Sequence, residues 1–199
     1  MTCKDCIHKT ACLDWCRGFG QEAKLCEHFS VLISIHPKWC DLIASGNKTI
    51  EVRKTRPKNE TPFRCYIYET KARSDMPTFV DEDGHVLYTG RGQVIGEFVC
   101  DYIIADIRGE FAVEFEDEGC IPIEEQRKYS PKGIIYGWHI SDLKIYDKPR
   151  ELKKFCVWKK CNSCKISGYE STACMYDEDC KVPVVITRPP QSWCYVEEL

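Results

Sequence analysis

The sequence lacks a strong surplus of charge of either sign. It has 28 Lys and Arg residues against 31 Asp and Glu residues, which leaves a net charge of −3. Proteins that contact long stretches of phosphate backbone are usually basic, so this balance argues against broad, nonspecific nucleic-acid binding. If the chain binds nucleic acid, we expect a local patch that takes a small ligand or a short single strand.

Long apolar runs are also lacking. No segment approaches the ~20 apolar residues that a membrane-spanning helix needs. The opening Met1-Thr2-Cys3-Lys4-Asp5 does not resemble a signal peptide. We therefore predict no membrane partner and expect the protein in the cytoplasm. The pattern carries no signal for an oligomeric state.

Cysteine, by contrast, is abundant and clustered. Of the 15 cysteines, five lie in the first 26 residues and six in the last 44. In a reducing compartment, clustered thiols bind metal more often than they form disulfides. Two Cys-x2-Cys pairs have the spacing by which two thiolates reach one ion from a tight turn. We predict two structural zinc ions per chain, each held by four thiolates: Cys3, Cys6, Cys12 and Cys26 for one, and Cys161, Cys164, Cys174 and Cys180 for the other.

These ligand sets have alternatives. Cys16 or His28 can replace a ligand of the first site, and Cys156 or Cys194 one of the second. A tail with free thiols is a further interpretation of the first set, and an iron–sulfur cluster of the second; one site shared by both ends is another. Cys194 also fits a packed residue on a final strand. We divide the chain into a Cys-rich zinc-binding segment (1–29), a central domain (30–155), and a second Cys-rich zinc-binding segment with a closing strand (156–199).

The central domain begins with a strand, a helix and a second strand over residues 31–54. Pro37 suits the first turn of the helix, and Gly46 suits the left-handed position after it. Ile50 and Val52 then alternate with polar residues, as in a half-buried strand. Further strand patterns cover 63–68, 93–104 and 134–146, the last as one strand or a bent strand pair. A short helix at 121–126 and a polar excursion, loop or hairpin, at 71–91 complete the pattern. This order predicts an α+β, mainly β fold: a small β-barrel with short flanking helices.

Charged residues on this framework mark a candidate site. The turn after Gly46 brings Lys48, Glu51 and Arg53 close to the end of the helix. Glu97 lies on an apolar strand face, where a buried carboxylate needs a cation. We predict that these four residues converge on one pocket at the barrel mouth, with the helix as a wall. The alternative is a structural ion pair. Candidates for base stacking are Trp39, Tyr66, Tyr68, Tyr136 and Trp138, and candidate proton carriers are His36 and His139.

The octapeptide GNKTIEVR at residues 46–53 matches the signature G-x-K-x-x-E-x-R. With the later strands G-x-x-x-G-E and Y-G-W-H, it makes residues 31–155 resemble an ASCH domain of the PUA-like superfamily. The tail ITRPPQSWCYVEE looks like that of phage-borne ASCH proteins. The resemblance therefore implies a PUA-like barrel and a phage or prophage origin, in a bacterial cell or phage-infected host.

The resemblance also implies a ligand and a chemistry. ASCH domains are expected to bind RNA or nucleotide-like ligands in the cleft that holds the signature, which here provides Lys48, Glu51 and Arg53. With Glu97 from the later strand and Trp39 as the stacking ring, these are the predicted ligand-binding residues. Some members hydrolyse an N4-acylated cytidine with a Lys, a Thr and a Glu; others are linked to RNA cleavage. Lys48 holds the lysine position, Glu97 the glutamate position and Glu51 the threonine position, with Thr49 as the reserve hydroxyl.

Three functions therefore compete. The first is an RNA- or nucleotide-binding protein with structural zinc. The second is a hydrolase, either an amidohydrolase or a ribonuclease, with Lys48, Glu97 and Thr49 as catalytic residues. The third is a phage-type module in which zinc segments bind another protein.

Overall fold

The structure of the protein is a computed structural model that describes residues 30–58, 60–71, 79–80, 86–88, 90–107, 112–131, 133–160 and 181–199. Within these ranges the chain is mainly β with a few short helices, as predicted. The eight predicted zinc ligands lie outside the described residues, as do Cys16 and His28. No helix in the described ranges is long and apolar enough to cross a membrane.

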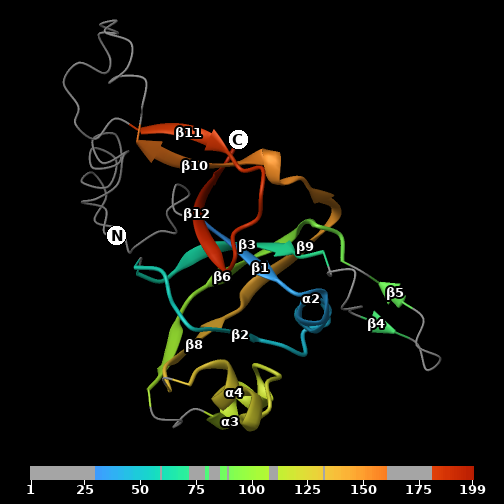
Figure 1. The fold of residues 1–199 in the computed structure, drawn as a ribbon, viewed down its shortest axis with the longest axis vertical. Helices are drawn as coiled ribbons and strands as arrows, with labels where there is room; N and C mark the ends of the chain where they lie inside the picture. The colour runs from blue at the N-terminus through green and yellow to red at the C-terminus, as the bar shows by residue number, and fades with distance from the viewer. Residues whose placement is uncertain are drawn as a thin grey trace, which may run out of the picture.

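Seven strands form the larger sheet, in the order β11-β10-β12-β1-β3-β6-β9 (Figure 1). At its centre, β1 runs parallel to β3 and antiparallel to β12. All six residues of β1 are buried, as expected of a central strand covered on both faces. The described parts of the segment 156–199 therefore belong to the same sheet as β1. The strands are β1 (Ser30–Ile35), β3 (Phe63–Glu69), β6 (Gln93–Cys100), β9 (Ser141–Arg150), β10 (Phe155–Lys160), β11 (Lys181–Val185) and β12 (Trp193–Glu198).

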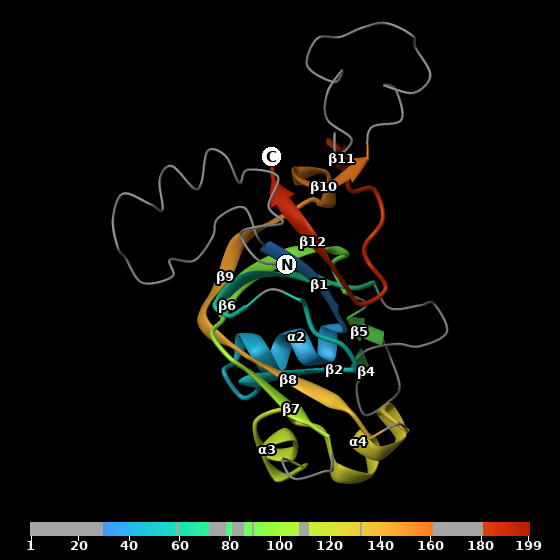
Figure 2. The same ribbon diagram turned by 90° about the vertical axis from the view of Figure 1, so that its left-hand side faces the viewer.

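A smaller sheet joins β2 (Ile50–Arg53), β8 (Ile135–His139) and β7 (Ile103–Asp106), in the order β2-β8-β7. The chain passes directly from one sheet to the other between β6 and β7 and again between β8 and β9 (Figure 2). The single strand predicted over 93–104 is thus corrected, because Asp101 and Tyr102 separate β6 from β7. The alternative of a bent strand pair over 134–146 is confirmed. Pairing among the described strands gives three separate sheets, of seven, three and two strands, so the closed barrel stays a prediction.

Short helices cover the sheets. Helix α2 (Pro37–Ala44) begins at Pro37 as predicted, and Gly46 follows it with φ +75°. The predicted helix at 121–126 is α4 (Ile123–Tyr129), and α3 (Ala112–Asp117) precedes it. Phe115 of α3 packs close to β8, because a Cβ atom on Gly137 would lie 2.4 Å from its ring. The remaining elements are the 3-10 helix η2 (Leu152–Lys154) and the strands β4 (Phe79–Val80) and β5 (Val86–Tyr88), which pair within the excursion at 71–91.

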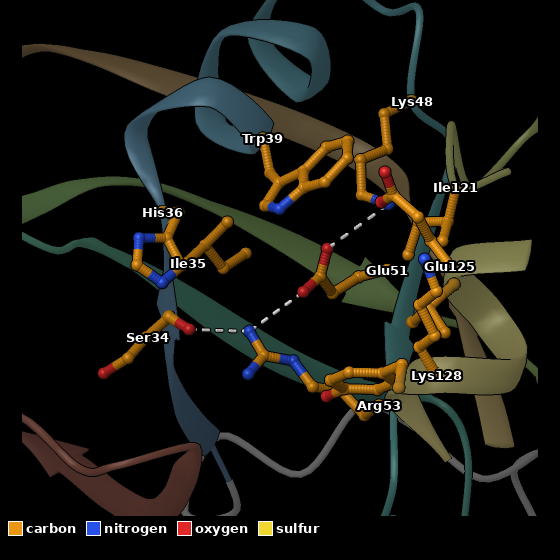
Figure 3. Close-up of a pocket in the computed structure, with 12 residues that line it drawn as sticks. Ser34, Ile35, His36, Trp39, Lys48, Glu51, Arg53, Ile121, Glu125 and Lys128 are labelled. Carbon is orange, nitrogen blue, oxygen red and sulfur yellow. Dashed lines mark hydrogen bonds and ion pairs between the residues drawn. The ribbon is translucent and has the colours of Figure 1, made fainter. Parts of the chain in front are cut away.

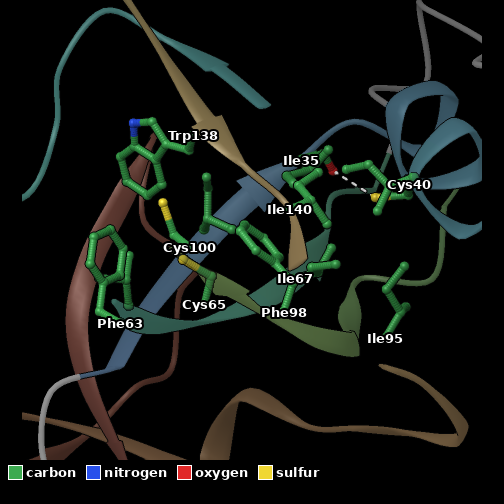
Figure 4. Packing of buried hydrophobic residues seen from close by; sticks show 13 residues of the cluster. Ile35, Cys40, Phe63, Cys65, Ile67, Ile95, Phe98, Cys100, Trp138 and Ile140 are labelled. Atoms are coloured by element: carbon green, nitrogen blue, oxygen red, sulfur yellow. Dashed lines mark hydrogen bonds between the residues drawn. The ribbon is translucent and has the colours of Figure 1, made fainter. Parts of the chain in front are cut away.

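The main hydrophobic core lies on the inner face of the larger sheet (Figure 4). Val31, Ile33 and Ile35 of β1 point into it, while Leu32 packs on the outer face with Tyr66 and Phe155. This alternation has the period of two that a strand imposes. The ring of Trp138 from the smaller sheet meets Phe63 edge to face at 5.8 Å, which joins the two sheets through the core.

Candidate functional site

A pocket with a cavity volume of about 420 Å³ opens where the end of β1, the helices α2 and α4, and strand β2 meet (Figure 3). This volume lies within the range of small-molecule sites. Four of the predicted ligand-binding residues line it: Trp39, Lys48, Glu51 and Arg53. The other lining residues are Ser34, Ile35, His36, Val52, Ile121, Glu125, Lys128 and Tyr129.

Local structure explains how the signature residues reach the pocket. The backbone N–H of Lys48 donates to the carbonyl of Leu42, which fastens the turn after Gly46 to α2. The next two N–H groups, of Thr49 and Ile50, both donate to the carbonyl of Glu118. Ile50 and Val52 pack against Phe115 of α3. Because side chains alternate along a strand, Glu51 and Arg53 then point the other way, into the pocket.

Glu51 lies between two cations at the floor of the pocket. One carboxylate oxygen is 2.9 Å from Nη2 of Arg53, and the other is 3.6 Å from Nζ of Lys48. The three residues are only 5% (Glu51), 8% (Arg53) and 2% (Lys48) exposed. Charges buried this deeply are tolerated only when they are paired and hydrogen-bonded. We call Lys48, Glu51 and Arg53 the floor triad.

Backbone carbonyls fix both cations of the floor triad. The ammonium of Lys48 donates to the carbonyl of Gly119, and Nη2 of Arg53 donates to the carbonyl of Ser34 at 2.6 Å. Burial lowers the pKa of Lys48 from its usual 10.5, and the nearby Glu51 carboxylate opposes that shift. Nε of Arg53 has no hydrogen-bond partner among the described residues. The floor is therefore held in place by backbone contacts, and Nε of Arg53 remains as a buried donor that a ligand could use.

Aromatic rings line the rim, and lysines lie against them. Trp39 of α2 is half-buried, and its ring centroid lies 5.1 Å from Nζ of Lys48 and 4.7 Å from Nζ of Lys38. Across the pocket, Nζ of Lys54 lies 4.5 Å from the ring centroid of Tyr129 on α4. Burial raises the pKa of Tyr129. Each ring therefore has a lysine ammonium close enough to its centroid for cation–π attraction.

Sequence analysis did not predict the pocket residues that α4 provides. Glu125, Lys128 and Tyr129 are spaced i, i+3 and i+4, which places them on one face of a helix. This spacing was the available signal, but the helix was predicted to end at residue 126. His36 sits at the rim and is exposed.

Glu97 does not share this pocket, which corrects the predicted convergence of four residues. Its carboxylate accepts a hydrogen bond of 2.5 Å from the hydroxyl of Tyr146 on the outer side of the larger sheet. In the ladder Glu97 lies opposite Tyr66, which belongs to the outer cluster. The pairing of β6 with β9 shifts register on both sides of Glu97. A bulge of this kind breaks strict alternation, so Ile95 and Phe98 both face the inner core.

Thr49 is not among the residues that line the pocket either. Its hydroxyl donates to the carboxylate of Glu118 at 3.2 Å. The remaining candidates are dispersed: Trp138 is fully buried in the inner core, and Nδ1 of His139 lies 2.6 Å from the carboxylate of Asp101. The described residues contain no cluster of three or more His, Cys, Asp or Glu side chains suited to a metal ion.

The fold and pocket define a mainly-β protein with a buried charged site between two sheets. Its fold is similar to that of the crystal structure of an ASCH protein from Zymomonas mobilis, with a TM-score of 0.50, 17% identity, and coverage of 83% of this chain and 86% of that one. A tyrosine-to-phenylalanine variant of that protein matches with a TM-score of 0.51 and 17% identity, over 83% and 88% of the two chains. A serine-to-alanine variant matches with a TM-score of 0.51 and 16% identity, over 85% and 89%.

A comparison with curated proteins finds no match. The profile of the ASCH domain matches residues 33–181. The chain therefore belongs to the ASCH domain family, as its sequence motifs suggested. ASCH domains are associated with RNA binding.

Proposed function

We propose that the protein binds RNA or a nucleotide in the pocket formed by β1, α2, β2 and α4. The observation that carries this proposal is the floor triad, a carboxylate between two cations inside a cavity with an aromatic wall. Maintaining buried charges beside an open cavity is costly unless they serve a ligand or a specific structure. The family's association with RNA supports the same choice.

Each pocket residue then has a chemical role. Glu51 accepts a hydrogen bond from an N–H group on the edge of a base. Arg53 and Lys48 hold that carboxylate in place and offer donors to a carbonyl oxygen of the base. Trp39 provides a ring on which the base stacks, an interaction worth about 1–3 kcal/mol per base.

Calorimetric titration with nucleosides, nucleotides and short RNAs tests the proposal. Glu51→Gln and Trp39→Ala are expected to weaken binding by about 5- to 150-fold, which corresponds to a base contact of about 1–3 kcal/mol. Glu97→Gln is the matched control, because it makes the same change on the outer face and is expected to leave binding intact. Circular dichroism checks that each variant is folded. Absence of binding to all three ligand classes would reject the proposal in favour of the protein-interaction module.

We also propose that the two Cys-rich segments hold structural zinc, on the basis of their ligand spacing. Metal analysis of protein purified without chelator is expected to return about two zinc ions per chain, one for each set of four cysteines. Removing the metal should unfold the end segments, because in such sites binding energy is folding energy. A content well below one ion per chain would contradict both sites.

Hydrolysis in the same pocket is the second candidate. The lowered pKa of Lys48 favours it, because a buried lysine that loses its proton more readily is a better general base. The substrates to test are an N4-acylated cytidine and single-stranded RNA. Turnover that is lost in Lys48→Met and retained in Glu97→Gln would establish an amidohydrolase or ribonuclease centred on Lys48. Turnover that needs Glu97 would contradict this arrangement.

A further inference from the structure

The floor and the rim of the pocket differ in the charges that they offer. At the floor, each cation already contacts Glu51 and a backbone carbonyl. A phosphate placed there would meet the carboxylate of Glu51, which repels it. The floor therefore suits a neutral base with N–H donors better than it suits a phosphate.

Exposed cations lie at the rim and against its aromatic rings. Lys128 lines the pocket, Lys54 sits against the ring of Tyr129, and Lys38 sits against Trp39. All three lysines are exposed, so their ammonium groups are available to a ligand that lies across the opening. One rim carboxylate, Glu125, reduces this charge but leaves an excess of cations. Exposed lysines beside aromatic rings are typical of sites for single-stranded nucleic acids, where the rings stack bases and the cations contact phosphates.

We propose, on the basis of the proposed function, that the ligand is an unpaired nucleotide within an RNA strand, which enters the pocket base first. Its neighbouring phosphates lie on Lys54 and Lys128 on one side and on Lys38 on the other. A free nucleoside fills only the floor, and a duplex cannot present a base to it. The three lysines therefore determine affinity for the strand and not affinity for the base.

Fluorescence anisotropy with a labelled single-stranded RNA of about six nucleotides tests this proposal, since single-strand sites cover about 4–16 nucleotides. The test variant is Lys54→Gln with Lys128→Gln. Each phosphate contact to a single strand contributes about 0.7 to the slope of log affinity against log salt. The double variant should reduce that slope by about 1.4, which corresponds to a difference of about 25-fold in affinity for each tenfold change in salt concentration.

The matched control is Lys144→Gln with Lys153→Gln, which removes two exposed lysines from β9 and η2. It should change RNA affinity less than about twofold, as expected for distant charges screened by salt. Nucleoside affinity, measured by calorimetry, should be the same in the wild type and in both double variants. A duplex of the same sequence should bind more weakly than the single strand.

The outcomes separate the two proposals. Suppose that the wild type binds nucleosides, but that Lys54→Gln with Lys128→Gln binds RNA with the same affinity and salt slope as the wild type. The lysines then do not contact the strand, and the proposed function stands. If the duplex binds as tightly as the single strand, the base-first arrangement is wrong. If neither nucleosides nor RNA binds the wild type, the proposed function fails and this inference fails with it.

Discussion

The floor triad and a second polar cluster on the outer face of the larger sheet are built from similar side chains but are anchored differently. In the outer cluster, Tyr146 donates to Glu97, Tyr66 donates to Glu198 at 3.2 Å, and Arg150 pairs with Glu198. Side chains from β3, β6, β9 and β12 therefore hold one another. In the floor triad, by contrast, both cations donate to backbone carbonyls and form ion pairs with Glu51.

The two clusters also differ in their surroundings. The pair of Arg150 and Glu198 is about one third exposed, whereas Lys48 and Glu51 are almost fully buried beside a cavity. An exposed network can exchange its partners for water at little cost. A buried one cannot, so its geometry is maintained whether or not a ligand is present. The comparison indicates that burial and backbone anchoring, more than residue type, distinguish a candidate binding site from a link between strands.

The largest expected effect is the difference in stability between a variant of Glu51 and the same variant of Glu97. Glu51→Gln leaves two buried cations without their counter-charge and should lower the free energy of unfolding by about 3–5 kcal/mol. Glu97→Gln keeps an acceptor for Tyr146 on the outer face and should cost about 1 kcal/mol. Urea denaturation of both variants measures the difference. Equal losses would remove the distinction between the clusters.

The second effect concerns pH and Lys48. Because burial lowers the pKa of Lys48, the folded state binds fewer protons than the unfolded state between that lowered pKa and 10.5. The contribution of Lys48 to the free energy of unfolding should therefore rise with pH across this window. The rise is about 1.4 kcal/mol for each unit by which the pKa of Lys48 is lowered. Urea denaturation at a series of pH values compares the wild type with Lys48→Met, and the exposed Lys144→Met serves as the control. If the free energy of unfolding of the wild type, relative to that of Lys48→Met, fell as the pH rises, the prediction would be wrong.

The smallest effect tests the outer cluster by itself. Tyr146→Phe removes the hydroxyl that donates to Glu97 but keeps the ring against Arg150, whose guanidinium carbon lies 4.1 Å from the ring centroid. We expect a loss of about 1–2 kcal/mol in the free energy of unfolding, since the acceptor is a carboxylate. Ligand binding in the pocket should not change. A loss of binding in this variant would mean that the two faces of the sheet are coupled.

Local signals in the sequence predicted the strand, helix and strand of residues 30–53 because each boundary has its own chemical cause. Pro37 starts α2, and Gly46 takes the positive φ that follows it. The turn between them and β2 then determines where Lys48 and Glu51 lie. Signals of this kind act over a few residues, so they need no knowledge of the rest of the fold.

The face of Glu97 could not be predicted in the same way. Alternation assigns faces only while the strand stays regular, and β6 shifts register against β9 on both sides of Glu97. Contacts made by backbone atoms are also hidden from sequence analysis, because any residue can provide a carbonyl. The carbonyl of Gly119 receives the ammonium of Lys48 from 71 positions along the chain, and no pattern links them. Helix α3, with six residues, is too short to show a period.

The pairing of β1 with both β3 and β12 has a consequence for how the protein is made. Strand β3 follows β1 closely, but the loop before β12 contacts Ser34 from 156 positions further along the chain. During synthesis β1 can pair on one side only, and the other backbone edge of the apolar strand Ser30–Ile35 stays open until β12 emerges. Such distant pairing slows folding, and an open apolar edge attracts other chains. The strand that completes the sheet therefore also ends the period in which the nascent chain is most prone to aggregate.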